Sequence, residues 1–514
     1  MATEKKEWSN SSDDSTSAPS DINLAFHANR IYRRAKEVYQ KLEMLNYLSA
    51  GADDETDSCT MQSTPCYTDS SIEHLIKLPT NVPGREDKIL VVVILSITFF
   101  VQMFSRDFYM PFFESSLMAH PQRLQLSLPL LPVLNTVVSV LLTIPACVTI
   151  NKYGIRTCLL YSCAISSLGA SIRCLSIGDS TLILHMSAVL LSSTSVVVKP
   201  LTATVSTCCF LVGERNLATG FLTIASMTGA AGGLLMKKFM RPEELYPLSA
   251  TTNNQMHTYN VVALYICSGA NFVCLQLAFF LFPRESNKRK LCDQSTDTVK
   301  KCMVPSTSFL LQTVFKSIRQ NSDLVYIAMS YACSNALSWP WYQMIDITYS
   351  KVGFPQEVAM NCRLWMIIHT FVLSLSVCWL ADRRAGSNKH FGLVCQCLST
   401  LFMLWVVLTL CCKILRRRTT SMVTGVMFAF PLSWTTQSLL YELAADFAQP
   451  LPENLAVGLV CMLEIWCENS IYILLSVFPR FHFEWLHVVT FIAGFLSALF
   501  ITLLNGKKVH RYYN

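Results

Sequence analysis

The sequence predicts an all-α polytopic membrane protein with twelve transmembrane helices in two six-helix bundles. Hydrophobic residues make up 52% of its 514 residues and charged residues only 15%, whereas soluble domains carry about 25% charged residues. The mean hydropathy is +0.38. From residue 88 onward, apolar stretches recur that are each long enough to cross roughly 30 Å of hydrocarbon as a helix. This composition excludes a secreted disulfide scaffold, a disordered chain and an ordinary cytosolic enzyme.

Twelve such stretches follow one another along the chain, and a basic connection follows the sixth. The expected spans are 89–110, 127–150, 157–176, 182–207, 216–236, 259–282, 324–346, 363–381, 390–412, 421–445, 455–478 and 484–504. The expected organisation is a polar cytoplasmic segment 1–87, a six-helix bundle 88–283, a basic cytoplasmic linker 284–323, a second six-helix bundle 324–504 and a cytoplasmic tail 505–514.

The segment before the first span is polar and rich in Ser, Thr and Asp. Residues 21–50 show helical spacing of apolar residues, so an amphipathic helix is expected there, either on an anionic membrane surface or in water. No apolar run precedes residue 88, so we expect the first span, and not a cleavable signal peptide, to direct insertion.

The loops indicate which ends face the cytoplasm. Lys and Arg are more frequent on the side that carries both termini, which favours cytoplasmic termini. The loop Arg416–Arg418 disagrees, because it falls on the other side. The plasma membrane and the endolysosomal membrane both remain open as locations.

Two loops at equivalent positions of the halves carry a related motif. Asn151, Gly154 and Arg156 follow the second span, and Asp382 and Arg383 follow the eighth. A glycine permits a tight turn at this place. An acid and an arginine there can pair across helix ends and stabilise one conformer, so we expect these five residues to form a conformational latch. Asn151 replaces the acid in the first half, which predicts a weaker latch there.

Polar residues at membrane depth are costly and are therefore candidate site residues. Arg106 and Asp107 are adjacent, so their side chains should diverge by about 100° and meet different helices or water. A proline lies between Trp339 and Gln343, and interrupted helices often border the substrate of a transporter. Those aromatic rings could bind a cation or form an interfacial belt. Glu464 is the first candidate for proton or cation coupling.

Two carboxylates, a lysine and a run of small residues also lie within the expected spans. Glu464 and Glu468 are four residues apart and share a helix face, so together they require a proton, a cation or water. Lys199 precedes a proline and is expected either to reach the interface or to join the site. The small residues 228–233 predict close helix packing.

No motif of an enzyme, a cofactor site or a metal site occurs. The sequence has no Walker A loop, no His-Glu-x-x-His, no Gly-x-Ser-x-Gly and no Cys-x-x-Cys. The 21 cysteines lie mostly in apolar runs, as small core residues do. We therefore expect no enzyme activity, no cofactor, no metal and no nucleic-acid partner.

The layout of six helices, a charged linker and six helices is that of the major facilitator superfamily. Four strings also resemble one family within it, the feline leukemia virus subgroup C receptor-related family. They are Leu168-Gly169-Ala170-Ser171-Ile172-Arg173-Cys174, Gly154-Ile155-Arg156-Thr157, Gln343-Met344-Ile345 with Glu357-Val358-Ala359, and Ala444-Ala445-Asp446 with Pro450-Leu451-Pro452-Glu453.

The resemblance implies a carrier of a small organic solute, namely heme, choline, ethanolamine or a vitamin-like compound. The carrier would work by alternating access, either facilitated or coupled to a proton or cation. A non-transporting receptor or scaffold on the same fold is the alternative.

The choline-type pocket of that family uses a Trp on helix 1, an aromatic residue on helix 7 and Gln residues on helices 5 and 11. Arg106 here takes the place of the Trp, Ser193 that of the upstream Gln, and Ile465, beside Glu464, that of the second Gln. Trp339 or Asn335 matches the aromatic residue. The substrate-binding set expected from these positions and from membrane depth is Arg106, Tyr109, Ser193, Trp339, Gln343 and Glu464. Arg106 would favour an anionic group.

Overall fold

The structure is a computed structural model. It describes residues 85–108, 130–175, 181–239, 250–283, 314, 316–384, 386–410, 419–448, 451–477 and 484–504. The expected helix at 21–50, the tail 505–514, the loop Arg416–Arg418, nearly all of segment 1–87 and most of linker 284–323 lie outside these ranges.

Every regular element in the described ranges is helical. The first half contains α3 (Arg85–Asp107), α6 (Leu130–Leu175), α7 (Thr181–Cys209), the short η1 (Val212–Glu214), α8 (Arg215–Phe239) and α9 (Ala250–Phe280). The second half contains α12 (Ser322–Asn335), α13 (Ser338–Gln343), α14 (Ile345–Val352), α15 (Gln356–Arg383), α16 (Asn388–Leu410), α17 (Thr419–Asp446), α18 (Glu453–Val477) and α19 (Glu484–Leu503).

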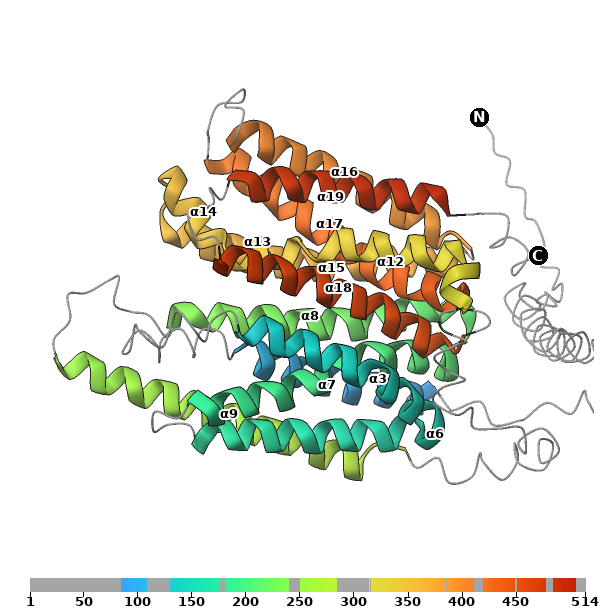
Figure 1. Cartoon of the computed structure of the whole chain (residues 1–514), viewed down its shortest axis with the longest axis horizontal. Helices are drawn as coiled ribbons and strands as arrows, with labels where there is room; N and C mark the ends of the chain where they lie inside the picture. Colours follow the sequence, from blue (N-terminus) through green and yellow to red (C-terminus); the bar gives the residue numbers. More distant parts are fainter. Residues whose placement is uncertain are drawn as a thin grey trace, which may run out of the picture. The chain divides into compact units, whose positions relative to one another are not determined.

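The helices of each half pack together, and the two halves meet along a few helices. Figure 1 shows α3 to α9 in one group and α12 to α19 in another, with the long helices running in roughly the same direction. Contacts between the groups run mainly from α6 and α7 to α18, and from α8 to α15 and α17. A site between the halves therefore lies among these six helices and α3, α12 and α13.

Nine helices in the described ranges are long and apolar enough to cross a membrane. One of the nine, Val133–Leu175, is 43 residues long and covers two expected spans. Two other expected spans are not among the nine. Span 324–346 is divided among the short helices α12, α13 and α14. Span 421–445 forms the continuous α17, whose buried stretch Ser433–Ser438 is mostly polar.

Gly154 divides α6 as the sequence predicts. Its backbone is non-helical, with φ 83° and ψ 173°. A residue with a Cβ rarely adopts this positive φ. The chain therefore kinks at the point between the expected spans 127–150 and 157–176.

The close packing expected of the small residues 228–233 occurs between α8, which contains them, and α3. A Cβ added at Gly229 would lie 2.2 Å from the carbonyl oxygen of Phe100, and one at Gly233 would lie 2.7 Å from that of Phe104. Only glycine permits backbones to approach this closely.

The helices of both halves run between two ends, each of which takes the name of a residue near it. At the Asp382 end, α15 finishes while α8 and α18 begin. At the Gln343 end, α3 and α13 finish while α6 and α15 begin.

Candidate functional site

A cavity of about 130 Å³ lies between the two halves. Its lining includes the last residues of α3 and the end of α13, so it extends from the middle of the helices toward the Gln343 end. The lining residues are Met103, Arg106, Asp107, Asn135, Ala188, Ser192, Lys199, Thr223, Ser226, Met227, Ala230, Trp339, Gln343, Gln437, Tyr441, Glu464, Ile465, Glu468, Asn469 and Tyr472.

Four of the six expected substrate-binding residues lie in this lining, namely Arg106, Trp339, Gln343 and Glu464. Tyr109 is outside the described residues. Ser193 is not among the lining residues, and its hydroxyl donates to the carbonyl of Leu190 in its own helix at 2.6 Å. Its neighbour Ser192 lines the cavity instead. A shift by one residue turns a side chain by about 100° around a helix, so Ser192 and Ser193 face different directions.

Arg106 and Asp107 do not separate as expected. The Arg106 Nε lies 2.6 Å from Asp107 Oδ1, and its Nη2 lies 2.8 Å from Asp107 Oδ2. Both residues end α3, where the backbone is no longer constrained by a following turn, and the long arginine side chain folds back onto its neighbour. The guanidinium is thus neutralised by a two-point carboxylate contact.

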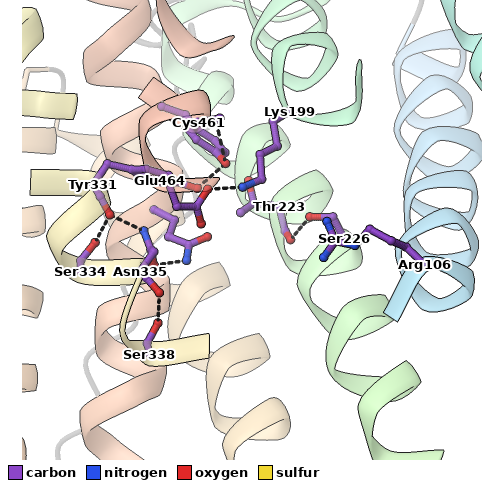
Figure 2. A network of polar contacts seen from close by, with 12 residues as sticks. Arg106, Lys199, Thr223, Ser226, Tyr331, Ser334, Asn335, Ser338, Cys461 and Glu464 are labelled. Carbon is purple, nitrogen blue, oxygen red and sulfur yellow. Dashed lines mark hydrogen bonds and ion pairs between the residues drawn. The ribbon is translucent and has the colours of Figure 1, made fainter. Parts of the chain in front are cut away.

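Lys199 of α7 forms an ion pair with Glu464 of α18, and the pair joins the two halves. Only 2% of the Glu464 side chain and 17% of the Lys199 side chain is exposed. Figure 2 shows the two side chains pointing toward each other from helices of different halves, with Arg106 on a separate helix. Lys199 therefore joins the site, and of its two predicted roles the structure favours this one.

Hydroxyl, thiol and aromatic groups lie beside this ion pair on the second-half side. The Tyr331 and Tyr441 hydroxyl oxygens are 2.5 Å apart, and the Cys461 thiol donates to Tyr441 at 3.5 Å. The Lys199 ammonium lies 5.8 Å from the centre of the Tyr331 ring, within the range of a cation–π contact. The helices α12, α17 and α18 therefore place neutral polar groups beside the ion pair.

An aromatic cluster forms the wall near the end of α13. The rings of Trp339 and Trp434 stack with centroids 5.1 Å apart and planes at 22°. Tyr342 meets both rings edge-on, with centroids at 5.9 Å and 5.5 Å. Tyr342 is fully buried, and Trp339 lines the cavity. The cluster can present a flat apolar face to a solute.

At the Asp382 end, contacts between the halves close the assembly. Asp382 accepts hydrogen bonds from the Asn216 backbone N–H at 3.0 Å, the Asn216 side-chain amide at 2.9 Å and the Leu217 backbone N–H at 2.8 Å. These donors belong to the first turn of α8. Glu442 of α17 also accepts a hydrogen bond from the Thr219 hydroxyl of α8.

The latch therefore differs from the pairing that the motif predicts. Asp382 pairs with the N-terminus of α8, where free N–H groups and the helix dipole favour an anion. The Arg383 guanidinium instead lies 3.8 Å from the centre of the Trp379 ring. In the first half, Arg156 donates to the carbonyl of Phe279 at the end of α9, at 2.9 Å, and the side chain of Asn151 is exposed.

The corresponding contact of the first half is made by other residues. Asn454 of α18 donates to the carbonyl of Cys147 in α6 at 3.1 Å. A Cβ at Gly458 would lie 2.8 Å from the Cys147 Sγ. Near the Asp382 end of the other interface, a Cβ at Gly220 would lie 2.9 Å from the Cys378 Sγ. The halves thus meet tightly at the Asp382 end, and the cavity lies toward the other.

No protein-family model matches the chain. A solute carrier family 49 member 4 homolog of Xenopus laevis is 23% identical over 372 residues, which cover 70% of this chain and 79% of that protein. The Xenopus tropicalis homolog is 22% identical over 375 residues, with the same coverage of both chains. FucP, a major facilitator superfamily transporter solved in the outward conformation, superposes with a TM-score of 0.58 at 10% identity, over 82% of this chain and 99% of its own.

The chain has the fold of major facilitator superfamily transporters. Its sequence is distantly similar to the solute carrier family 49 member 4 homologs, which agrees with the resemblance that the four sequence strings carry. The likeness to FucP concerns the fold. Nine helices of the described part of the chain are candidate membrane spans, as expected of a multi-pass membrane protein.

Proposed function

We propose that this carrier moves a small organic solute by alternating access, with twelve spans in two six-helix bundles and cytoplasmic termini. The turn at Gly154 supplies two spans from α6, the chain α12–α13 supplies another, and α17 supplies one more. The Asp382 end would then face the cytoplasm, and the cavity would face outward.

The observation that carries the proposal is the position of the cavity between the halves, closed at one end by contacts that join them. Asp382 and Glu442 from the second half hold the first turns of α8 in the first half. Rocking of the halves would break these contacts and close the Gln343 end. A cavity with several polar residues in its lining also supports a carrier over the alternative. A receptor or scaffold has no need of a polar space at membrane depth.

The size of the cavity favours a small solute. Its 130 Å³ is close to the volume of an engineered cavity, about 150 Å³, that holds one benzene. Choline, ethanolamine or a vitamin with a single ring fits this scale. A tetrapyrrole does not, so heme is the least favoured of the family's substrates in this conformation.

The charges of the cavity weigh against an anionic substrate. Arg106 is held by Asp107, and Lys199 is held by Glu464. Glu468 also lines the cavity, so the lining has three carboxylates against two cationic groups. The preference for an anion that Arg106 implies in the sequence is therefore offset, and a cationic or neutral solute is favoured.

Coupling to a proton or cation would act through Glu464. Its ion pair with Lys199 joins α7 to α18 across the halves. Protonation of Glu464, or a competing cation, would weaken this attraction and ease the separation of the helices. Facilitated transport does not require Glu464 to gain or lose a proton or cation. The pH dependence of flux therefore distinguishes facilitated transport from coupled transport.

A panel of uptake and efflux assays in proteoliposomes tests the proposal. The panel contains choline, ethanolamine, pyridoxine, heme and a small anionic metabolite, each with and without a pH gradient. Saturable flux of a cationic or neutral small solute is expected. Absence of flux for the whole panel in both directions, from folded protein, would contradict a carrier for this family's substrates and favour the receptor.

A further inference from the structure

Arg363 of α15 is a buried arginine that makes four contacts around one break in the chain. Only 5% of the residue is exposed. Its Nε donates to the carbonyl of Tyr342 at 3.2 Å, and its Nη2 donates to the carbonyl of Gln343 at 2.8 Å. Its Nη1 lies 2.7 Å from the Asp346 carboxylate. Its guanidinium carbon lies 5.6 Å from the centre of the Tyr342 ring.

These contacts join the two sides of the break between α13 and α14. The two carbonyls belong to the last residues of α13, and Asp346 lies in the first turn of α14. Met344 between them has φ −93° and ψ 8°, outside the helical region. Carbonyls at a helix C-terminus have no partner inside the helix. One planar guanidinium satisfies two of them and pairs with the acid at the next helix start.

The segment that Arg363 holds forms part of the cavity wall. Gln343 lines the cavity, and its backbone carbonyl is fixed by Arg363. Tyr342, whose ring packs beside the guanidinium, meets Trp339 and Trp434 edge-on. The positions of Trp339 and Gln343 in the wall therefore depend on a side chain that does not itself line the cavity.

We propose that Arg363 is a positioning residue for substrate binding, which fixes α13 against α15 so that Trp339 and Gln343 face the solute. This inference rests on the proposed carrier function. Arg363 ties the short helix to α15, so the wall moves with α15 when the halves rock. Lysine cannot replace it, because an ammonium is a point charge without the fork that spans two carbonyls and a carboxylate.

Two measurements on full-length protein test this role. The first is equilibrium binding of radiolabelled choline, with ethanolamine and pyridoxine as competitors. The second is hydrogen exchange of the backbone amides of residues 338–350. Arg363→Lys should weaken binding about tenfold or more, the scale of one lost charged hydrogen bond, and should speed exchange in 338–350. Asp346→Asn removes only the partly exposed ion pair and should have a smaller effect.

The matched control is Arg319→Lys, an exposed arginine that precedes α12, which should change neither readout. Unchanged binding and exchange in Arg363→Lys would overturn the proposal. Faster exchange throughout α12 and α15 would also overturn it, because the arginine would then support the fold in general. Wild-type protein could bind neither choline nor a competitor, while exchange in Arg363→Lys rises only in 338–350. The assigned substrate class would then fail, and the attachment of α13 to α15 by Arg363 would stand.

Discussion

Neutralising Asp382 should open the assembly at the Asp382 end. The carboxylate accepts three hydrogen bonds, two of them from the backbone N–H groups that begin α8. Asp382→Asn keeps the shape but replaces one accepting oxygen with an N–H₂ that cannot accept. A hydrogen bond to a charged group contributes about 1.5–3 kcal/mol, and an anion at a helix N-terminus about 0.3–1 kcal/mol.

We therefore expect the state closed at this end to lose about 2 kcal/mol relative to the state open there, roughly a 30-fold change in their ratio. The thiol of Cys378 reports on that change. It is fully buried between α15 and α8, so a maleimide can reach it only after the halves separate. Its labelling rate, followed by mass spectrometry, should rise about 30-fold.

Cys362 is the internal control, because it is buried in the same helix near the Gln343 end. Its labelling should not rise. Asp346→Asn, which removes one charge from the opposite end, should leave the rate at Cys378 unchanged. The reasoning is refuted if Asp382→Asn leaves Cys378 unreactive, or if both cysteines become reactive together.

Three other perturbations test separate parts of the site. Glu464→Gln should abolish the pH dependence of flux if this carboxylate couples transport, and an unchanged pH profile would remove it from that role. Lys199→Met leaves the buried Glu464 carboxylate without its cation and should cost about 3–5 kcal/mol of stability. Adding Glu464→Gln to this variant should recover much of the lost melting temperature. No recovery in the double variant would contradict a direct ion pair. Gly229→Ala should cost about 1–3 kcal/mol by overpacking, because its Cβ would meet the Phe100 carbonyl, whereas Gly269→Ala, with nothing within 4 Å, should be neutral or slightly stabilising in a thermal unfolding assay.

The features predictable from sequence are those that depend on neighbours in the chain. Apolar stretches predict helices by length, and each expected span coincides with a helix or with consecutive short helices. Gly154 marks the turn in α6 because a positive φ is a local property of the backbone. The proline at position 340 marks the interrupted helix, and it lies in the first turn of α13, where proline costs no hydrogen bond.

Pairings between distant residues were not predictable from one sequence. Lys199 and Glu464 are 265 residues apart, and no local pattern indicates that their helices meet. The partner of Asp382 is the start of a helix in the other half, which a search for a complementary side chain overlooks. Arg106 and Asp107 pair because α3 ends at these residues, so the divergence expected of a continuing helix does not apply.

The role of Arg363 was overlooked for a related reason. In the sequence it is a single arginine near the start of an apolar span, where an interfacial position is the ordinary expectation. Its partners are backbone carbonyls, which carry no signal in the amino-acid sequence. Only the break between α13 and α14 creates unpaired carbonyls for it to bind.

A reversible cross-link at the Asp382 end tests alternating access most directly. In Gly220→Cys the new Cβ would lie 3.3 Å from the Cys378 Cβ, near the 3.5–4.5 Å separation of a disulfide. We expect oxidation to join α8 to α15 and stop flux of the transported solute, and a reductant to restore it. Gly220→Ser should show neither effect. Full flux through protein that mass spectrometry shows to be cross-linked would contradict the rocking of the two halves.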